Sequence, residues 1–467
     1  MTLIKSISGI RGTIGGRAGD SLSPVDVLNI SLAFGSYLKN KFPGQDIKVV
    51  IGRDARISGP LVNSIICSGL ISLGIDVVDG GLATTPTVEM AVTELSAHGG
   101  IIITASHNPK NWNALKLLNE KGEFLSQKDG EDILKLSNEG NFEFATVDKL
   151  GIYSQDDNWL ETHIQKIIDL PLVDIDAIQN AEFTIAIDCV NSVGGIAIPE
   201  LLKALGVKNV IELYCEPSGA FPHNPEPLAE YLTELASEVA RSKAHLGFAV
   251  DPDVDRLAIV CENGEMFGEE YTLVAVADYI LQHKQGNTVS NLSSTIALKD
   301  VTEKHNGKYF TSAVGEVNVV EKMKEVNAVI GGEGNGGVIY PDLHYGRDAL
   351  VGIALFLTFL AKSGKSCSSL KNIFPEYHIS KNKIELSVDF NIDEIFNKIA
   401  ERYKKYEINR VDGIKITFGQ DWVHLRTSNT EPIIRIYSES DSLVKADHLA
   451  DKLKSDIREI MKGEQED

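Results

Sequence analysis

The sequence lacks the features that mark a membrane protein or a secreted protein. Its most apolar run extends only from Ala349 to Ala361, which is too short to span a bilayer and favours a buried helix. Residues 1–5 lack the apolar core of a secretory signal. The five cysteines lie in apolar segments without paired spacing, as in reduced intracellular proteins. We therefore expect a cytoplasmic protein.

A basic excess is also missing. The 467 residues include 66 aspartates and glutamates but only 45 lysines and arginines, which gives a net charge of −21. Nucleic acid or an anionic membrane would require a broad basic surface, so neither is expected as a partner. A small anionic ligand remains compatible with this charge, provided that a few arginines gather at one place.

Helix and strand patterns alternate along the chain, as in layered α/β folds. Ser23 and Pro24 have the residue types of an N-cap and a first helical position, and apolar residues follow at helical spacing. Apolar strands are expected at 47–52, 183–188 and 246–251. Functional loops of such folds follow the carboxyl ends of the strands. Polar or glycine-rich breaks at 155–157, 262–264 and 362–366 indicate boundaries, and the chain after the last break reads as a smaller α+β unit.

The stretch 104–109, Thr-Ala-Ser-His-Asn-Pro, follows the apolar run 99–103. A buried strand therefore leads into a sharp polar loop with the hydroxyl of Ser106 at its crest. An ordinary turn would have the same local pattern. Phosphate-handling segments elsewhere in the chain favour a phosphorylated nucleophile.

An acidic motif at 251–256 carries Asp251, Asp253 and Asp255, followed by Arg256. In an extended segment residues two apart share a face, so the three carboxylates are expected to converge. Three hard oxygen ligands suit Mg²⁺, which also takes a phosphate oxygen. A solvated acidic turn is the alternative, but strand patterns on both sides count against it. An EF-hand is excluded because Arg256 stands where that loop needs glycine.

Two further loops contain residue types that bind phosphate or sugar. The glycine-rich segment 331–337 would let the backbone approach a ligand closely, although a plain hairpin loop explains it nearly as well. The segment 426–435 combines hydroxyls, an amide and two arginines, which together form a donor-rich nest for a phosphate. A capped turn is the alternative there, and an arginine among apolar strand residues at 435 favours recognition.

Arginines also lie near the N-terminal end of the chain, in two glycine-bearing loops. Arg11 is the better candidate to contact a ligand, whereas Arg53 and Asp54 read as an internal ion pair. His107 follows Ser106, but neighbouring side chains of an extended loop point apart. We therefore expect His107 to hold the loop and to be a poor general base.

In this order and spacing, the four loops resemble the α-D-phosphohexomutase superfamily over nearly the whole chain. The resemblance implies an α/β protein: three related mixed-sheet α/β domains and a smaller C-terminal α+β domain around a central cleft, the last acting as a mobile lid. The corresponding domains are expected at 1–153 (serine loop), 154–258 (metal loop), 259–370 (sugar loop) and 371–467 (phosphate loop).

The resemblance also implies a reaction. Ser106 would carry a phosphoryl group, donate it to a hexose phosphate, and recover the other phosphate from the bisphosphorylated sugar. Magnesium would be held by Ser106 and the three aspartates, and glucose or glucosamine 1,6-bisphosphate would serve as activator. A serine hydroxyl is a weak nucleophile, so transfer must depend on positioning and on charge neutralisation. Further implied residues are Lys116, Arg11, Arg256 and His107 at the reacting group, Glu333 and Asn335 at the sugar, and Arg426, Ser428, Asn429, Thr430 and Arg435 at the distal phosphate.

Some positions depart from the family pattern. Many relatives have serine and histidine where this chain has Asn335 and Gly337, so the second proton-transfer group is open between His344 and Arg347. The glycine-asparagine-glycine sugar loop looks most like archaeal-type phosphoglucosamine mutases. This similarity favours interconversion of glucosamine 6-phosphate and glucosamine 1-phosphate, with phosphomannomutase or phosphoglucomutase activity as the alternative. The partner is then a small sugar phosphate, and the enzyme a monomer or homodimer.

Two other functions remain as hypotheses. Residues 250–253 resemble the nucleophile strand of aspartyl-phosphate phosphatases, but Asp255 stands where that family usually has threonine or valine. A non-catalytic sugar-phosphate sensor would share the same loops, although none of the catalytic motifs is damaged.

Overall fold

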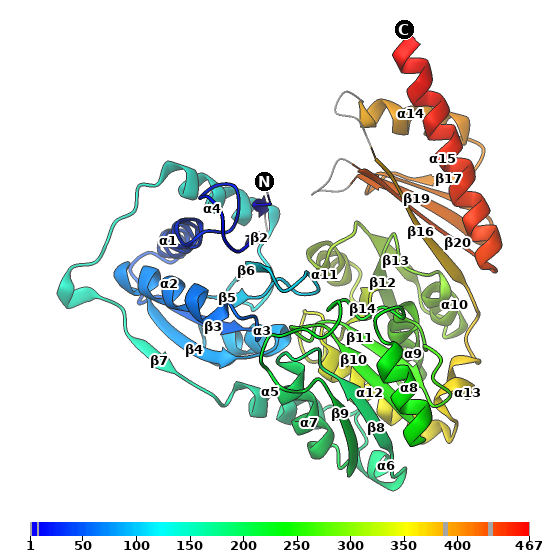
Figure 1. The fold of residues 1–467 in the computed structure, drawn as a ribbon, viewed down its shortest axis with the longest axis horizontal. Helices are drawn as coiled ribbons and strands as arrows, with labels where there is room; N and C mark the ends of the chain where they lie inside the picture. The colour runs from blue at the N-terminus through cyan, green and yellow to red at the C-terminus, as the bar shows by residue number, and fades with distance from the viewer. Residues whose placement is uncertain (1, 7–8, 386–390, 428–432, 467) are drawn as a thin grey trace. The chain divides into compact units, whose positions relative to one another are not determined.

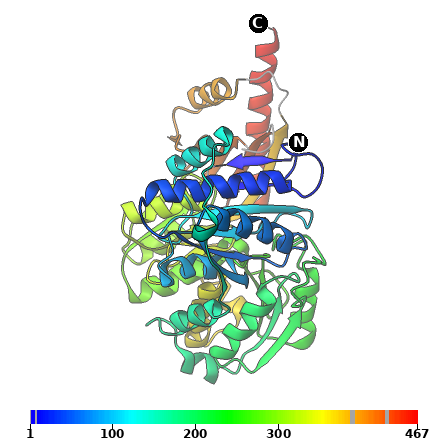
Figure 2. The ribbon, with the colours of Figure 1, turned by 90° about the vertical axis from the view of Figure 1, so that its left-hand side faces the viewer.

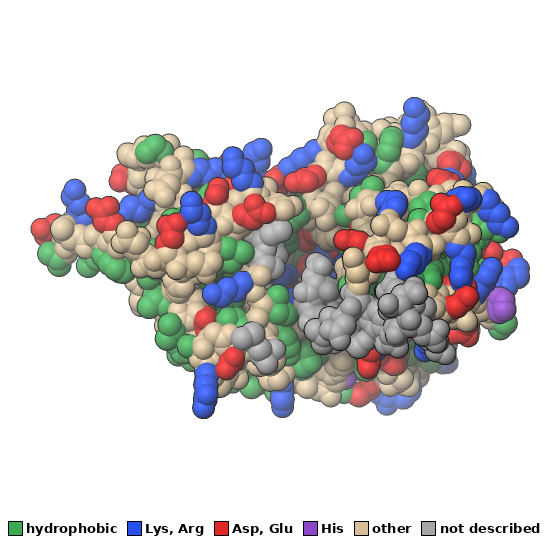
Figure 3. Space-filling model, turned by 90° about the horizontal axis from the view of Figure 1, so that it is seen from above, with side chains coloured by type: hydrophobic (Ala, Val, Ile, Leu, Met, Phe, Trp, Pro, Cys, Tyr) green, Lys and Arg blue, Asp and Glu red, His purple; other side chains and the backbone are tan. Residues whose placement is uncertain are grey.

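The computed structural model describes residues 2–6, 9–385, 391–427 and 433–466. The chain divides into two compact units, Met1–Tyr279 with Asn335–Lys371, and Ile280–Gly334 with Asn372–Asp467. Among the described residues, every helix is too short or too polar to span a lipid bilayer. On the face shown in Figure 3, basic and acidic side chains are mixed, and neither sign forms a broad patch.

The first unit begins with a mixed sheet that has helices on both faces (Figure 1). Its alternate strand residues face opposite sides: Val49 and Ile51 pack with α1 and α2, and Val50 packs with α3. Figure 2 gives a second view of α1 and α2 together on one face. The strands, in sheet order, are β1 (Ile4–Ser6), β2 (Gly9–Thr13), β6 (Trp112–Leu118), β5 (Gly99–Ile103), β3 (Lys48–Arg53), β4 (Asp76–Leu82) and β7 (Tyr153–Gln155). The helices are α1 (Pro24–Lys41), α2 (Gly59–Ser72), α3 (Thr85–Glu94) and α4 (Gln127–Glu139), with a 3₁₀ turn at Val147–Lys149.

The expected N-cap of the first long helix is confirmed. The Ser23 side chain accepts from the backbone of Asp26, and the Asp26 side chain accepts from the backbone of Ser23, which is a capping box. Pro24 occupies the first helical position.

A second sheet in this unit has β10 (Leu246–Val250) paired in parallel with β8 (Thr184–Asp188) and antiparallel with β11 (Leu257–Cys261). The hairpin between β10 and β11 carries the acidic motif. The apolar run expected to form a buried helix is α12 (Ala349–Ser363), buried along its length except at the last turn. The other elements are β9 (Asn209–Leu213), β15 (Gly337–Ile339), α5 (Trp159–Ile168), α6 (Ile175–Asn180), α7 (Gly194–Ala204), α8 (Thr233–Ser242) and α13 (Cys367–Lys371), with α9 (Glu269–His283) crossing the boundary between the units.

The second unit has a small parallel sheet and the C-terminal α+β domain. In the parallel sheet, β12 (Asn287–Asn291) lies between β13 (Tyr309–Ser312) and β14 (Ala328–Glu333), with helices α10 (Ala297–Lys304) and α11 (Glu316–Glu325). In the C-terminal domain, α14 and α15 cover one face of an antiparallel sheet. Its elements are β16 (His378–Glu385), β20 (Ile433–Ser440), β19 (Asp421–Thr427), β18 (Ile414–Phe418), β17 (Glu407–Asn409), α14 (Ile392–Arg402) and α15 (Leu443–Glu466).

Candidate active site

The serine loop begins where β5 ends. The Thr104 hydroxyl donates to a carboxylate oxygen of Asp54 (2.6 Å) and accepts from the Ser106 backbone N–H (2.9 Å). Ser106 has φ 48°, in the left-handed region that a residue with a side chain rarely adopts. Such a conformation persists only where the surroundings enforce it, and it is concentrated at functional sites.

A buried arginine that the sequence analysis did not select holds this loop. Arg56 is fully buried and pairs through Nε with Asp54 at 2.9 Å. Its two terminal nitrogens donate to four backbone carbonyls of the loop and the strand after it, those of Ser106, Asn108, Pro109 and Trp112. The expected ion pair of Arg53 with Asp54 is wrong, since the Arg53 guanidinium donates to the Asp54 backbone carbonyl and the carboxylate pairs with Arg56. The Asp54 side chain also accepts from the Arg56 backbone N–H, and this local turn brings the side chains of 54 and 56 together.

The three aspartates of the acidic motif converge, as the sequence predicts. Asp251, Asp253 and Asp255 are fully buried, and one carboxylate oxygen from each lies within 4.8 Å of the others. The backbone is a tight turn, however, and not the extended segment on which the prediction was based. Val254 at its centre has φ 63°, a strained conformation for a β-branched residue.

Ser106 lies against this triad. Its hydroxyl donates to an Asp251 carboxylate oxygen at 2.6 Å, so the hydroxyl and the acidic motif share one site. Burial, and then the charges of Asp255 and Asp253, raise the pKa of Asp251 well above its usual value. One oxygen of Asp253 and one of Asp255 are buried without a hydrogen bond. A divalent cation would relieve this repulsion and use these oxygens, so the residues fit the expected magnesium.

Two basic side chains partly neutralise the triad. Lys116 Nζ lies 2.7 Å from Asp253 Oδ2 and 3.3 Å from Asp255 Oδ2, and Arg347 Nη2 lies 2.7 Å from Asp255 Oδ2. Burial opposes ionisation of Asp255, but Arg347, Lys116 and Arg256 outweigh it and hold the pKa of that carboxyl well below its usual range. Asp253 and Asp255 likewise raise the pKa of Lys116 against the effect of burial. Lys116 is therefore a fixed cation at the triad.

Of the two arginines expected at the reacting group, Arg256 lies beside the triad. Its backbone N–H donates to Asp251, its guanidinium Nε lies 3.9 Å from Asp255 Oδ1, and its Nη1 pairs with Glu226 at 3.1 Å. Arg11 lies on β2, where its register partner is Ala114, two residues before Lys116 on β6. Arg11 therefore lies on the strand beside the one that carries the lysine.

His107 lies closer to the serine than expected. Its Nδ1 is 3.4 Å from Ser106 Oγ, because the left-handed backbone at Ser106 turns the two side chains toward each other. Burial and the nearby Arg256 lower the pKa of His107 well below its usual value. The ring is therefore neutral at physiological pH.

Thr85 is a second residue, after Arg56, that the sequence did not indicate, and it contacts the triad. Its hydroxyl donates to Asp253 Oδ2 at 2.6 Å, and its backbone N–H donates to the Asp253 carbonyl at 2.9 Å. These bonds fix the acidic loop to the N-terminus of α3. A threonine in a helix-start pattern carries no sequence signal for this contact.

The sugar loop contains the point in the sequence where one unit ends, at Gly334, and the other resumes, at Asn335. Asn335 Oδ1 accepts from the Gly337 backbone, and the Gly336 carbonyl accepts from Leu257. Gly336 has φ 86°, and a Cβ there would lie 2.5 Å from the Leu257 carbonyl, so only glycine fits. In the second unit Glu333 is buried and accepts from Asn291 (2.7 Å) and from the Gly315 backbone (3.1 Å).

The two candidates for proton transfer, Arg347 and His344, have different contacts. Arg347 contacts the triad, whereas His344 lies between Glu89 and Asp348 with 13% of its side chain exposed.

In the C-terminal domain, basic residues line up across three strands. Arg426 on β19 is the register partner of Arg435 on β20, which is in turn the partner of Lys383 on β16. Like charges directly opposite each other on a sheet are destabilising. Lys383 was missed by sequence reasoning because only the strand pairing reveals its neighbours. The expected Ser428, Asn429 and Thr430 lie outside the described residues.

Comparison with known families agrees with this arrangement along the chain. The profiles of phosphoglucomutase/phosphomannomutase alpha/beta/alpha domains I, II and III match residues 3–144, 161–264 and 268–377, and that of the C-terminal domain matches 389–455. The chain belongs to the phosphoglucomutase/phosphomannomutase family. The expected fold class of three α/β domains and a C-terminal α+β domain is confirmed, while the boundaries at 153, 258 and 370 stay a prediction.

Individual members of the family cover nearly the whole chain. It is 36% identical over 458 residues to a phosphoglucomutase/phosphomannomutase of Thermococcus kodakarensis (97% of this chain, 99% of the relative). It is 32% identical over 467 residues to a phosphoglucosamine/phosphogalactosamine mutase of Sulfurisphaera tokodaii (97% and 98%). A solved phosphoglucomutase/phosphomannomutase family protein of Burkholderia thailandensis superposes with a TM-score of 0.84 at 27% identity (98% and 97%). The protein is thus a phosphohexomutase, an isomerase of carbohydrate metabolism, and the expected resemblance to phosphoglucosamine mutases is confirmed.

Proposed function

We propose that this phosphohexomutase moves phosphate between the 6- and 1-positions of a hexosamine, through a phosphoserine at residue 106 and a bisphosphorylated sugar. The 2.6 Å contact between Ser106 and Asp251, beside Lys116, carries the proposal. In the forward step the P–O bond to Ser106 Oγ breaks and a P–O bond to the sugar hydroxyl forms. The proton of that hydroxyl passes to a base. In the return step the P–O bond to the other sugar oxygen breaks, that oxygen takes up a proton, and the phosphoryl group forms a new bond to the serine oxygen.

Basic side chains supply the electrostatic part of this reaction. Phosphoryl transfer depends chiefly on positioning and on neutralising the charge of the transferred group. Lys116, Arg347 and Arg256 lie at or beside the triad, where they can stabilise that charge. Arg347 contacts the triad and is better placed than His344 to stabilise charge near the reacting oxygens, but a guanidinium cannot accept a proton and so is not the base. His107 would orient Ser106.

Asp251, Asp253 and Asp255 would hold Mg²⁺, together with an oxygen on Ser106. When bound, the ion neutralises phosphate charge as a Lewis acid. A solved N-acetylphosphoglucosamine mutase of Aspergillus fumigatus, 12% identical with a TM-score of 0.57, was crystallised with GlcNAc-6P and magnesium. Since that likeness concerns the fold alone, the reason for proposing magnesium here is the set of buried carboxylates, two of which have an oxygen without a hydrogen bond.

The three basic residues in register in the C-terminal domain are proposed to bind the phosphate group of the sugar that does not react. Arg426, Arg435 and Lys383 lie in register on adjacent strands, and their mutual repulsion is offset if a phosphate dianion lies among them. Glu333 and Asn335 would hold sugar hydroxyls, and Ser428, Asn429 and Thr430 would complete the phosphate contacts.

Glucosamine phosphate is proposed as the preferred substrate. The glycine-asparagine-glycine sugar loop and several relatives named phosphoglucosamine mutase support this choice. The higher identity to a phosphoglucomutase/phosphomannomutase supports the second candidate, activity on glucose and mannose phosphates.

The deciding experiment compares kcat/KM for glucosamine, glucose and mannose phosphates under one set of conditions, with glucose 1,6-bisphosphate as activator. A preference for glucosamine phosphate supports the proposal, and a preference for either neutral sugar supports the second candidate. Labelled phosphate on Ser106 should survive mild alkali, whereas an alkali-labile label would support an aspartyl phosphate.

A further inference from the structure

A second group of metal-ligand atoms lies in the first unit, outside the acidic triad. His163 on α5 and His344 in the loop before α12 both direct Nε2 at the same oxygen of Asp348, at 2.9 and 3.3 Å. His163 and Asp348 are fully buried, and the three ligand atoms lie within 4.8 Å of one another. We propose that His163, His344 and Asp348 bind a second metal ion, a divalent transition ion of the zinc class. This proposal does not depend on the reaction proposed above.

The contacts of the two Nδ1 atoms favour a bound metal ion over a cluster held by hydrogen bonds alone. His163 Nδ1 lies 2.9 Å from the Thr87 hydroxyl, and His344 Nδ1 lies 3.4 Å from a Glu89 carboxylate oxygen. Histidines that bind metal through one nitrogen usually donate the other N–H to such an oxygen. If both Nε2 atoms instead carried protons for Asp348, His344 would lie between two carboxylates and could donate to both only as a doubly protonated imidazolium. A cation among the Nε2 atoms lets a neutral ring bind it through Nε2 and donate its Nδ1 proton to Glu89.

The carboxylate and the rings are oriented by other contacts. Asp348 is the N-cap of α12, where its Oδ1 accepts from Leu350 (2.8 Å) and Val351 (3.3 Å), which leaves Oδ2 for the cluster. The two imidazole planes are nearly perpendicular, at 89°, with centroids 6.1 Å apart. Ligand atoms of a tetrahedral zinc with bonds of about 2.1 Å are about 3.4 Å apart. The contact of His344 already matches that spacing, and that of His163 requires a shift of about half an ångström.

The donor set selects a different ion from the one expected at the triad. Two imidazoles and one carboxylate suit zinc, cobalt or nickel, whereas magnesium prefers oxygen ligands alone. The two sites can therefore be filled independently.

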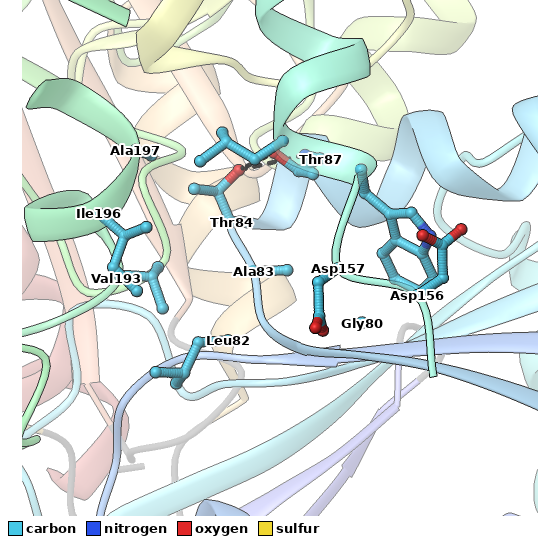
Figure 4. Close-up of a pocket in the computed structure, with 12 residues that line it drawn as sticks. Gly80, Leu82, Ala83, Thr84, Thr87, Asp156, Asp157, Val193, Ile196 and Ala197 are labelled. Carbon is cyan, nitrogen blue, oxygen red and sulfur yellow. Dashed lines mark hydrogen bonds between the residues drawn. The ribbon is translucent and has the colours of Figure 1, made fainter. Parts of the chain in front are cut away.

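An entry path and a consequence can both be read from the neighbouring residues. Thr87 and Thr84, whose hydroxyls are 2.7 Å apart, line a small pocket in the same unit (Figure 4). Both threonines are almost fully buried, however, and His344 is the member of the cluster that reaches solvent, with 13% of its side chain exposed. Arg347, the partner of Asp255, lies between His344 and Asp348 in the sequence, so a bound ion would fix the segment that presents it.

Cobalt provides the test, because it substitutes for zinc and has a visible spectrum. The full-length protein is stripped with a chelator, saturated with Mg²⁺ to fill the triad, and titrated with Co²⁺ while absorbance and bound metal are measured. We expect one Co²⁺ per chain that excess Mg²⁺ does not displace, a low-coordinate Co²⁺ spectrum, and a higher midpoint of thermal unfolding.

Two variants of the cluster and two control variants locate the ion. His344→Gln, at a partly exposed position where glutamine can still donate to Asp348, should weaken Co²⁺ binding by at least about 100-fold, and Glu89→Gln by about 10- to 100-fold. Asp253→Asn, in the triad, and His448→Gln, at an exposed histidine of α15, should bind Co²⁺ as the unaltered protein does. Absence of retained Co²⁺ in the unaltered protein, or equal affinity in folded His344→Gln, would overturn the proposal.

Discussion

Replacement of Arg56 by methionine tests whether one buried guanidinium holds the serine loop. The side chain is fully buried, pairs with Asp54, and donates to four carbonyls of residues 106–112. Methionine keeps much of the volume but leaves the Asp54 carboxylate without its cation and the carbonyls without a donor. Removal of one partner of a buried ion pair costs about 3–5 kcal/mol. We expect the local free energy of opening of this loop to fall by that amount.

Hydrogen–deuterium exchange measures this free energy at the loop itself. Since each 1.4 kcal/mol is a factor of ten, peptides covering 104–112 should exchange at least about 100-fold faster in Arg56→Met. Peptides from β19 and β20, in the other unit, serve as the internal control and should be unchanged. A displacement of Ser106 by about 1 Å can reduce turnover by about 100-fold, so kcat should fall while the C-terminal domain keeps its stability.

The control variant is Arg56→Lys, which keeps the charge but cannot reach Asp54 and four carbonyls with one ammonium group. It should give an intermediate exchange rate and an intermediate kcat. If Arg56→Met leaves both the exchange of 104–112 and kcat within threefold of the unaltered protein, Arg56 does not hold the loop.

Three further predictions concern the charged groups. Asp253→Asn should lower kcat by about 10²- to 10³-fold and raise the Mg²⁺ concentration for half-maximal activity, with an unchanged circular dichroism spectrum; an unchanged Mg²⁺ requirement would contradict the metal site. Lys116→Met should lower kcat by a similar factor and Lys116→Arg by less, whereas a loss confined to KM would exclude a role for the charge in the transition state. Burial lowers the pKa of His424 to about 4, so between pH 6.5 and 4 the unfolded chain binds a proton that the folded domain does not. The C-terminal domain should therefore lose about 2 kcal/mol between pH 7 and pH 5 in denaturant titrations, and His424→Gln should remove most of that loss.

The order of the functional loops could be predicted from the sequence because each loop follows an apolar strand. A strand pattern before Ser106 and another before Asp251 place both segments at strand ends. The expected convergence of the aspartates is observed, but a tight turn produces it and not the extended backbone on which the expectation was based. The hydrogen bond between Ser106 and Asp251 joins residues far apart in the chain, so only the family resemblance could indicate it.

The supporting residues could not be predicted, since their roles depend on tertiary packing. Arg56 and Arg53 look alike in a glycine-bearing loop, and only the turn after β3 decides which one meets Asp54. Thr85 has the sequence context of an ordinary helix start, and its bond to Asp253 comes from the packing of α3 against the acidic loop. Lys383 joins Arg435 through strand pairing between β16 and β20, which no local pattern specifies.

The central claim is that the hydroxyl of residue 106 accepts and returns the phosphoryl group. Its most direct test is peptide mass spectrometry of the protein after brief incubation with glucose 1,6-bisphosphate and Mg²⁺, with Ser106→Ala as the matched variant. The account predicts alkali-stable phosphate on the peptide that contains Ser106 and none in the variant. Phosphate on Asp251, or on no residue of an enzyme that still turns over, would contradict it.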